Sequence, residues 1–315
     1  MSAVLLVRVS TGTLAVLGLI DLKIVETPTT AYFLQYSPNG CSANCAFCLQ
    51  SRRLSRGNSE KLGRITWPLL SLETIKKYWK KNFTRICLQT VIKNNFINEA
   101  LEILGVISSF ESNLPISLAI TPVPRIYLER ALRLGVSAIG VGLDTATLQL
   151  FEKWNKPYSW NLYWRFIEKS VEIYGKGNVY VHFIAGLGES LRELVDTMKR
   201  IYRLGGRVAL FNYTNERGIS PVDIRYYRLA QLARYLLELE LNPDFYINYE
   251  HYRVVREIPL SSIVEAFYTT GCPGCNRPFY NESPRGPLYN IPSKRLLEIY
   301  YGKLREELAT IGVSL

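Results

Sequence analysis

The sequence predicts an α/β fold in which a parallel sheet curls into a partial or full barrel of βα units. Short runs of β-branched and aromatic residues alternate along the chain with longer amphipathic stretches, as expected when each strand is followed by a helix. A barrel of this kind needs roughly 200–250 residues. The 315 residues therefore accommodate one barrel and a shorter segment at each end.

Composition divides the chain into three expected parts. These are an N-terminal cap segment (1–29), the barrel (30–260) and a C-terminal extension (261–315) that is rich in Pro, Gly and Tyr and has little periodicity. The N-terminal segment is apolar over 3–9 and 14–20, and we expect a buried cap helix there. Arg8 interrupts it and no run approaches the roughly 18 apolar residues of a membrane span, so we expect none. No clear signal peptide is present either.

The expected barrel contains seven strands and seven helices. The strands are 31–35, 85–89, 116–120, 138–143, 179–184, 207–212 and 245–248. The helices are 71–81, 95–110, 124–134, 145–154, 160–174, 189–204 and 223–240. Gly135, Gly175 and Gly205 fall near predicted helix ends, where glycine easily adopts the left-handed conformation.

A net charge of +11 indicates an acidic partner. The basic residues are scattered, with short clusters only at 52–56 and 76–81, so we expect a protein partner and no nucleic acid. Five of the six cysteines lie in two close groups, which favours metal binding over disulfides and indicates a reducing, cytoplasmic location.

The most informative motif is a cysteine loop, Cys41-Ser-Ala-Asn-Cys45-Ala-Phe47-Cys48. Three thiolates at this spacing can hold three corners of a [4Fe–4S] cluster and leave the fourth iron open to a small molecule. A zinc knuckle that lacks its fourth ligand is the alternative. The loop follows the first predicted strand, and catalytic residues of barrels sit at the C-terminal ends of strands.

Further motifs follow the cysteine loop in order. Leu143-Asp144-Thr145 ends the fourth predicted strand, and Gly186-Leu187-Gly188-Glu189 follows the fifth, two residues after Ile184. Together with the segment from Cys41 to Gly57, which has the aromatic Phe47 before its third cysteine, these motifs resemble the radical S-adenosylmethionine (SAM) superfamily. The biotin synthase-like branch is the most similar, over about residues 30–250.

This resemblance implies a radical SAM-type TIM-like barrel and several roles at the cofactor. Asp144 would accept hydrogen bonds from the ribose hydroxyls of SAM, and Glu189 would cap the next helix or fix its loop. The remaining implied cofactor-site residues are Phe47, Ile184, Gly186 and Asn212, the last flanked by Phe211 and Tyr213 around the adenine. The chain departs from the branch at His182, where the motif has its first glycine, and at Gln89-Thr90-Val91 after the second strand.

Biotin synthase itself holds a second cluster on three strand cysteines and an arginine, and only Cys87 matches that set here. The other strand positions read Leu118 and Tyr180, the last strand has no arginine, and Gly142 replaces a substrate-contacting asparagine. The sequence therefore argues against biotin synthesis.

A second cysteine pair, Cys272-Pro-Gly-Cys275, lies in the extension. Two thiolates on a tight turn indicate a metal site. We expect a second iron–sulfur cluster with Cys87 as a candidate third ligand, and Ser283 or another oxygen donor could complete it, as a hydroxyl does in bacterial lipoyl synthase. A redox-active dithiol or a structural zinc half-site are alternatives.

With the segments 12–19 and 272–281, the whole chain most resembles a subunit of the archaeal two-component lipoyl synthase. That resemblance implies an enzyme that forms a 5′-deoxyadenosyl radical and inserts sulfur from the second cluster into an octanoyl chain. The implied partners are an acidic octanoylated lipoyl-carrier protein, a paired synthase subunit and a ferredoxin-type electron donor. Alternatives are a radical SAM enzyme of cofactor biosynthesis whose second cluster is not a sulfur source, and a non-catalytic zinc- or nucleic-acid-binding protein.

Two histidines and three tyrosines complete the candidates. His182 is expected to be a satisfied strand histidine rather than a proton-transfer residue, and His251 to face the substrate mouth or solvent. We expect Tyr268, Tyr280 and Tyr289 to pack over the barrel mouth.

Overall fold

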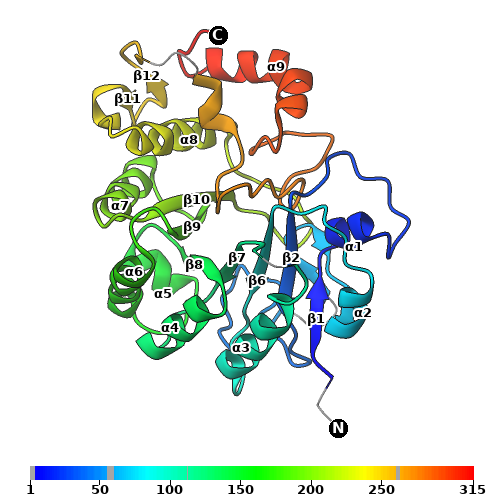
Figure 1. Cartoon of the computed structure of the whole chain (residues 1–315). Coiled ribbons are helices and arrows are strands. Elements are labelled where there is room, and N and C mark those ends of the chain that lie inside the picture. Colours follow the sequence, from blue (N-terminus) through cyan, green and yellow to red (C-terminus); the bar gives the residue numbers. More distant parts are fainter. Residues whose placement is uncertain (1–3, 55–59, 112, 260–262) are drawn as a thin grey trace.

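The computed structural model describes residues 4–54, 60–111, 113–259 and 263–315. An eight-stranded sheet, in the order β10-β9-β8-β7-β6-β2-β1-β5, forms its centre. Six neighbouring strands run parallel: β2 (Thr30–Gln35), β6 (Arg85–Gln89), β7 (Ile116–Ala119), β8 (Val136–Asp144), β9 (Val179–Ala185) and β10 (Arg207–Asn212). The predicted α/β class with a mostly parallel, barrel-type core is confirmed (Figure 1).

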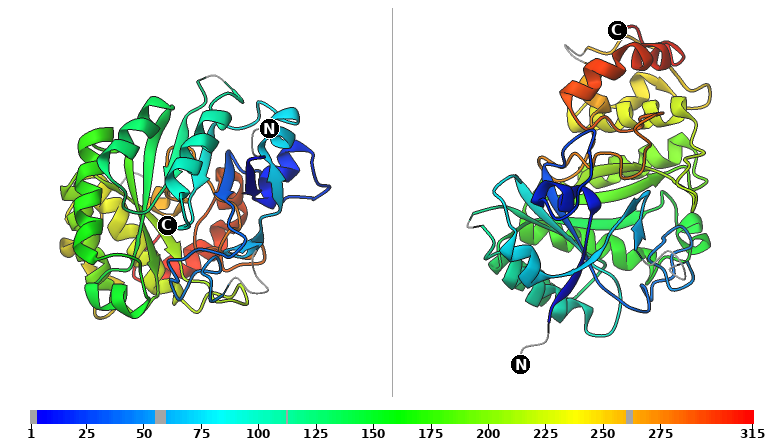
Figure 2. Two further views of the ribbon diagram at one scale, coloured as in Figure 1. Left: turned by 90° about the horizontal axis from the view of Figure 1, so that it is seen from below. Right: turned by 90° about the vertical axis from the view of Figure 1, so that its right-hand side faces the viewer.

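Helices follow the parallel strands and lie on the outer side of the curved sheet (Figure 2). They are α3 (Phe96–Ile107), α4 (Arg125–Arg133), α5 (Leu148–Lys153), α6 (Trp160–Tyr174), α7 (Leu191–Arg203) and α8 (Ile224–Glu238). Their ends use ordinary capping chemistry. Ser190 and Glu193 form a reciprocal capping box at the start of α7, and Gly135, Gly175 and Gly205, all with positive φ, follow α4, α6 and α7 as expected.

The expectation of an N-terminal cap helix is only partly correct. Residues Leu6–Val9 form β1, which pairs antiparallel with β2 and with β5 (Leu69–Ser71); the helix α1 (Thr11–Leu17) follows, and α2 (Leu72–Lys77) follows β5. Arg8 is buried, and its guanidinium donates to the carbonyl of Trp67 at 3.0 Å. A strand buried on both faces shows no alternation, so its sequence cannot be distinguished from a short buried helix.

The expected seventh strand, 245–248, is wrong. Pro243–Phe245 forms a 3-10 turn (η1), and β11 (Ile247–Asn248) pairs with β12 (Arg253–Val254) in a separate two-stranded sheet. A second small hairpin, β3 (Lys61–Leu62) with β4 (Ile65–Thr66), follows the cysteine loop. The parallel strands therefore form a partial barrel.

The C-terminal extension contains more structure than its composition indicates. A 3-10 turn η2 (Ile263–Phe267) and the 16-residue helix α9 (Lys294–Ala309) stack with α8 at one end of the molecule (Figure 1). The fully buried Arg228 of α8 donates to Glu307 of α9 at 2.8 Å and to the carbonyl of Tyr289 at 2.7 Å. The expected boundary at 260/261 lies outside the described residues.

Residues 268–282, here called the tail loop, close the gap between the last and first parallel strands. At the free edge of β10, the Leu210 N–H donates to Thr270 Oγ1 at 3.0 Å. On the opposite side of the gap, Tyr280 donates its hydroxyl to Ser10 Oγ, after β1, at 2.7 Å. The extension thus completes the wall of the barrel.

In the described part of the chain, no helix combines the length and the apolar character needed to cross a bilayer.

Candidate active site

A cavity of about 350 Å³ lies inside the curved sheet. Every second residue of the parallel strands faces it, as the two-residue period of a strand requires. Examples are Cys87 and Gln89 on β6, Gly140, Gly142 and Asp144 on β8, and Ala209 and Phe211 on β10. All six cysteines of the chain line this cavity.

The cysteine loop begins beyond the C-terminal end of β2 and is held by its own backbone. The Cys41 N–H donates to the carbonyl of Gln50 at 2.6 Å, and Arg52 N–H donates back to Cys41 O at 3.0 Å. The Ile92 N–H points at Cys41 Sγ, 3.2 Å away. Such a donor stabilises a thiolate or a metal-bound sulfur.

The three loop thiols fit a shared cluster. Burial, opposed in part by Lys156, raises the pKa of Cys45 to about 11. Burial and the neighbouring Cys45 raise the pKa of Cys48 to about 12, so the thiols interact electrostatically. Within the described residues, no group of three or more His, Cys, Asp or Glu side chains is arranged to hold a single metal ion. Three cysteines of one folded loop facing one cavity are a suitable donor set for a [4Fe–4S] cluster with an open iron.

Asp144 ends β8 at the same mouth of the barrel as the cysteine loop. Its backbone has φ of 66°, in the left-handed region, where the ladder with β9 shifts register. The Lys156 ammonium donates to Asp144 Oδ2 at 2.5 Å. This places a carboxylate that is already charge-paired on the cavity wall, where it can accept hydrogen bonds from a polyol such as ribose.

Aromatic and amide groups line the same mouth. Phe47 packs on Trp154 with ring centroids 5.9 Å apart, and Trp154 packs on Tyr213 at 5.7 Å. Asn212, also in the cavity wall, is fully buried, and neither atom of its amide has a hydrogen-bond partner in the described structure. An amide without a hydrogen-bond partner beside aromatic rings is suited to hydrogen-bond the edge of a purine base. Ile184 adds an apolar contact to this wall.

Gly186 and Glu189 support the loop after β9 rather than line the cavity. Glu189 is buried, and its carboxylate accepts hydrogen bonds from the N–H groups of Gly186 at 2.6 Å and Leu187 at 3.0 Å. Gly186 has φ of 97°, and a Cβ there would lie 2.5 Å from Val222 Cγ2. The structure therefore gives Glu189 the loop-fixing role that was one of its two expected roles.

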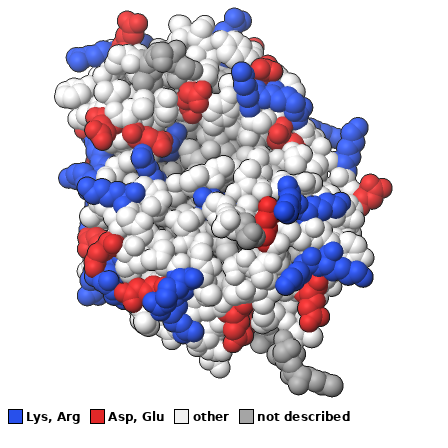
Figure 3. All heavy atoms as spheres, in the orientation of Figure 1, with Lys and Arg blue, Asp and Glu red and all other residues white. Residues whose placement is uncertain are grey.

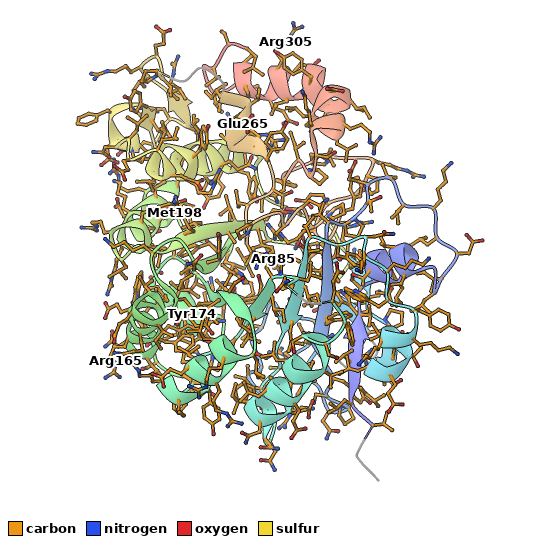
Figure 4. The ribbon with its side chains drawn as sticks, viewed as in Figure 1. Arg85, Arg165, Tyr174, Met198, Glu265 and Arg305 are labelled. Carbon is orange, nitrogen blue, oxygen red and sulfur yellow. The ribbon has the colours of Figure 1, made fainter. Side chains whose placement is uncertain are left out.

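Cys87, Cys272 and Cys275, here called the tail cysteine group, lie together towards the N-terminal ends of the strands. Burial and then the nearby Cys272 and Cys275 raise the pKa of Cys87. Burial and Cys275 raise the pKa of Cys272 to about 11. Arg85, labelled in Figure 4, anchors the turn by donating to the carbonyl of Pro273 at 3.1 Å.

The two cysteine groups therefore approach one cavity from opposite ends. The cysteine loop follows the end of β2, whereas the tail turn bonds Thr29, just before β2 begins, through the Thr29 N–H and Asn276 Oδ1 at 3.0 Å. A strand of six residues is about 20 Å long. In Figure 1 the orange tail loop crosses near the upper ends of the parallel strands, where they begin.

The structure does not bring Ser283 to the tail cysteine group. Its hydroxyl oxygen accepts the Arg285 N–H at 3.2 Å, and the residue does not line the cavity. Oxygen atoms that do face this end belong to Thr30, Tyr32 and Ser117. The Thr30 hydroxyl is buried and has no partner among the described residues.

His182 lies midway along the cavity. Its ring packs edge-on against Phe211 at 5.3 Å, and a Cβ on Gly140 would lie 2.9 Å from its Nε2. Burial lowers the pKa of His182 to about 4, with Asp144 opposing and Arg277 and Lys156 adding to the shift. The imidazole is therefore neutral near pH 7 and faces the cavity.

The other candidates lie elsewhere. His251 is exposed in the turn between β11 and β12, and its N–H donates to Asn248 Oδ1 at 3.0 Å. Tyr280 packs on Tyr32 and Trp67, with ring centroids 4.9 and 5.7 Å away. Tyr289 donates its hydroxyl to the carbonyl of Val222 at 2.7 Å. These contacts agree with a packing role for both tyrosines.

Sequence reasoning missed three residues of the site. Lys156, Trp154 and Arg277 all act through tertiary contacts; Arg277 stacks over Phe211 with its guanidinium carbon 3.7 Å from the ring centroid. Local sequence gives no signal for Lys156 or Trp154. The position of Arg277 two residues after Cys275 was a usable signal, because a cation beside a thiolate pair stabilises it.

Comparison with known proteins agrees with this geometry. The family model described as the Radical SAM superfamily matches residues 36–201. The crystal structure of HydG, a maturase of the [FeFe]-hydrogenase, superposes with a TM-score of 0.52 at 11% identity, covering 67% of this chain and 50% of that chain. Methylornithine synthase (PylB) superposes with a TM-score of 0.52 at 15% identity, covering 68% and 64%. A search of curated protein sequences gave no significant match.

The chain thus spans from half to just under two thirds of the length of these two structures, and at such identities they show the fold alone. The family match is stronger evidence, since it covers more than half of the chain and includes the cysteine loop, Asp144 and Glu189. A domain of this kind implies one [4Fe–4S] cluster and SAM, and the cavity offers donors for both. The chain belongs to the radical SAM superfamily.

Proposed function

We propose that this radical SAM enzyme inserts sulfur into an octanoyl chain carried by a protein, as one subunit of a two-component lipoyl synthase. The observation that carries the proposal is the position of the tail cysteine group, which faces the same cavity as the cysteine loop from its opposite end. A substrate between the two groups would have a radical source on one side and a sulfur source on the other.

At the first end, Cys41, Cys45 and Cys48 would hold the cluster. Asp144 would bind the ribose, and Phe47, Ile184 and Asn212 would surround the adenine. When bound, the cluster and SAM supply a carbon radical that removes a hydrogen atom from a nearby C–H bond. The protein's own contribution is to hold that bond in contact and to exclude water.

Between the ends, the cavity suits an unbranched alkyl chain. Two small residues on the strands, Ala119 and Ala209, line it, and Leu34 and Val91 add apolar surface to its wall. Burial of each methylene group from water contributes about 0.8 kcal/mol. An octanoyl chain would therefore be drawn in by its apolar surface rather than by hydrogen bonds.

At the second end, Cys87, Cys272 and Cys275 would hold a second iron–sulfur cluster that serves as the sulfur source. The guanidinium groups of Arg85 and Arg277 favour thiolates there, since both lower the pKa of Cys87 against burial and the neighbouring thiols. The backbone N–H of Arg277 donates to Tyr32 OH at 3.1 Å, which fixes the loop beside the pair. These contacts support a rigid ligand set.

The proposed partners are an acidic octanoylated carrier protein, a paired synthase subunit and a ferredoxin-type donor. Figure 3 shows Lys and Arg side chains interspersed with Asp and Glu over the face it presents. With a net charge of +11, such a surface speeds encounter with acidic proteins more than it deepens affinity.

The test is sulfur transfer from a labelled cluster. The chain is reconstituted without oxygen using heavy-isotope sulfide and is incubated with reductant, SAM and octanoylated carrier protein, with and without the candidate partner subunit. Mass spectrometry should find heavy sulfur on the octanoyl chain and 5′-deoxyadenosine in the supernatant. If 5′-deoxyadenosine forms but the carrier gains no sulfur, the proposal fails in favour of a superfamily enzyme whose second cluster is not a sulfur source.

A further inference from the structure

Lys156 forms a buried ion pair at the cofactor end of the cavity. Its ammonium donates to Asp144 Oδ2 at 2.5 Å and to the carbonyl of Gly142 at 2.8 Å. The side chains of Lys156 and Asp144 are only 5% and 14% exposed. A charge pair this deep is stable only if both partners are present, because removing one leaves the other unpaired and poorly hydrated.

Two aromatic rings enclose the same ammonium. It lies 5.3 Å from the ring centroid of Tyr163 and 5.8 Å from that of Phe47, which belongs to the cysteine loop. Ring faces attract cations, more so when water is excluded. Burial alone would lower the pKa of Lys156, but the Asp144 carboxylate and the surrounding groups raise it, so the side chain stays charged.

The backbone around Lys156 fixes its position. Asn155 before it has φ of 53°, and Pro157 after it restricts its conformation. The Lys156 N–H donates to the carbonyl of Phe151 at 3.1 Å, so the residue is tied to the end of α5. The ammonium is thus delivered to the cavity wall by a constrained turn rather than by a free loop.

Lys156 also lies beside the cysteine loop. Its ammonium is 5.8 Å from the ring centroid of Phe47, which lies between Cys45 and Cys48 in the sequence. A nearby cation stabilises the reduced form of a thiolate-bound cluster, because that form carries one more negative charge. The reduction potential of the cluster therefore becomes less negative. The same ammonium anchors Asp144, whose backbone φ of 66° is costly without such support.

We propose that Lys156 is a positioning residue that holds Asp144 towards the nucleoside and raises the reduction potential of the cluster on Cys41, Cys45 and Cys48. The inference rests on membership of the radical SAM superfamily and on these contacts. It is independent of sulfur insertion, since neither readout below requires the octanoyl substrate.

The first test is a redox titration of the reconstituted enzyme followed by electron paramagnetic resonance. Lys156→Met, which keeps the length of the side chain but removes its charge, should shift the midpoint potential of the cysteine-loop cluster to a more negative value. Lys156→Arg should shift it less. The matched control is Lys153→Met, since Lys153 is exposed three residues away and should leave the potential unchanged. An unchanged midpoint in Lys156→Met overturns the redox role.

The second test is equilibrium binding of S-adenosylhomocysteine, a stable stand-in for the cofactor. Lys156→Met should weaken binding at least about tenfold, and Lys153→Met should not; equal affinities for both variants overturn the positioning role. If Lys156→Met fails to fold because Asp144 is left unpaired, the neutral double variant Asp144→Asn/Lys156→Met replaces it in the titration. It is compared with Asp144→Asn, from which it differs only by the charge of Lys156; the double variant should have the more negative midpoint potential, and equal midpoints would overturn the redox role.

Discussion

The hydroxyl group of Tyr32 lies 3.2 Å from Sγ of Cys275, although 243 residues separate them in the sequence. The same hydroxyl accepts the backbone N–H of Arg277 at 3.1 Å. A strand at the start of the barrel therefore positions the turn that carries the tail cysteine pair. The extension is part of the cavity wall, and its thiols are fixed relative to the cofactor end.

Tyr32→Phe should make iron at the tail cysteine group more labile. The change removes the hydroxyl and leaves the Arg277 N–H without its partner, which costs about 1 kcal/mol in the free energy of unfolding. Iron release to a chelator, followed by absorbance, should become faster for part of the bound iron. Tyr127→Phe is the control, because the Tyr127 hydroxyl makes no hydrogen bond among the described residues. Identical iron-release curves for Tyr32→Phe and Tyr127→Phe would mean that the Tyr32 hydroxyl does not stabilise the tail cysteine group.

Gly140→Ala should disturb the middle of the cavity. The new Cβ would lie 2.9 Å from His182 Nε2 and 3.2 Å from Ala119 Cβ, so one of the two side chains must move. We expect a loss of about 1–3 kcal/mol in the free energy of unfolding. The loss should be smaller in a His182→Ala background, where the nearest obstacle is absent; denaturant unfolding measures both.

Gly105→Ala is the matched control for that prediction. Gly105 is exposed in α3 and a Cβ there meets nothing within 4 Å, so the change should stabilise the chain by about 0.5–1 kcal/mol. A similar effect of both substitutions would mean that the space over Gly140 is not restricted by His182.

Asn212→Ala should weaken SAM binding without lowering stability. Neither amide atom of Asn212 has a partner in the described structure, so its removal breaks no hydrogen bond and relieves an unpaired buried group. Asn290 is the contrasting control, because its amide accepts from Tyr227 at 3.1 Å and donates to Glu282 at 2.6 Å. Asn290→Ala should lower the melting temperature and leave cofactor affinity unchanged. The prediction is wrong if Asn212→Ala is the less stable of the two or binds SAM normally.

His182 should make the apo protein less stable in mild acid. Burial lowers its pKa in the folded chain to about 4, whereas the unfolded chain titrates near 6.5. Between these values the unfolded state binds more protons, so stability falls as pH falls through this window. The expected loss from pH 7 to 4.5 is about 2 kcal/mol. His182→Gln should remove this part of the pH dependence; parallel pH profiles for wild type and variant would contradict the prediction.

Much of the sheet could be predicted because parallel strands are buried on both faces and separated by amphipathic helices. The strands 85–89 and 207–212 begin and end as expected, and the other four parallel strands are predicted to within two residues. The prediction of a strand at 245–248 failed because only Ile247 and Asn248, after the Pro243 turn, form a strand, and they pair with β12 and not with the main sheet. The apolar run at 3–9 was expected to be helical and contains the strand β1 instead, because a short buried strand and a short buried helix have the same apolar pattern.

The parts of the site that could be predicted are those whose functional residues lie close together in the sequence. The cysteine loop, Asp144 and the Gly186–Glu189 turn carry their chemistry in local patterns. Lys156 does not, because an Asn-Lys-Pro sequence after a short helix has the pattern of a solvated turn. Only the packing of that turn against β8 and Phe47 makes the lysine a buried partner of Asp144.

The most direct test of the account is the iron left after the cysteine loop is disabled. Cys41, Cys45 and Cys48 are all changed to alanine, and iron and sulfide are counted after anaerobic reconstitution, beside wild type and the control Ser283→Ala. If the tail cysteine group holds its own cluster, the triple variant should retain about four irons per chain, and wild type and Ser283→Ala about eight. A triple variant with no bound iron would contradict the two-cluster cavity.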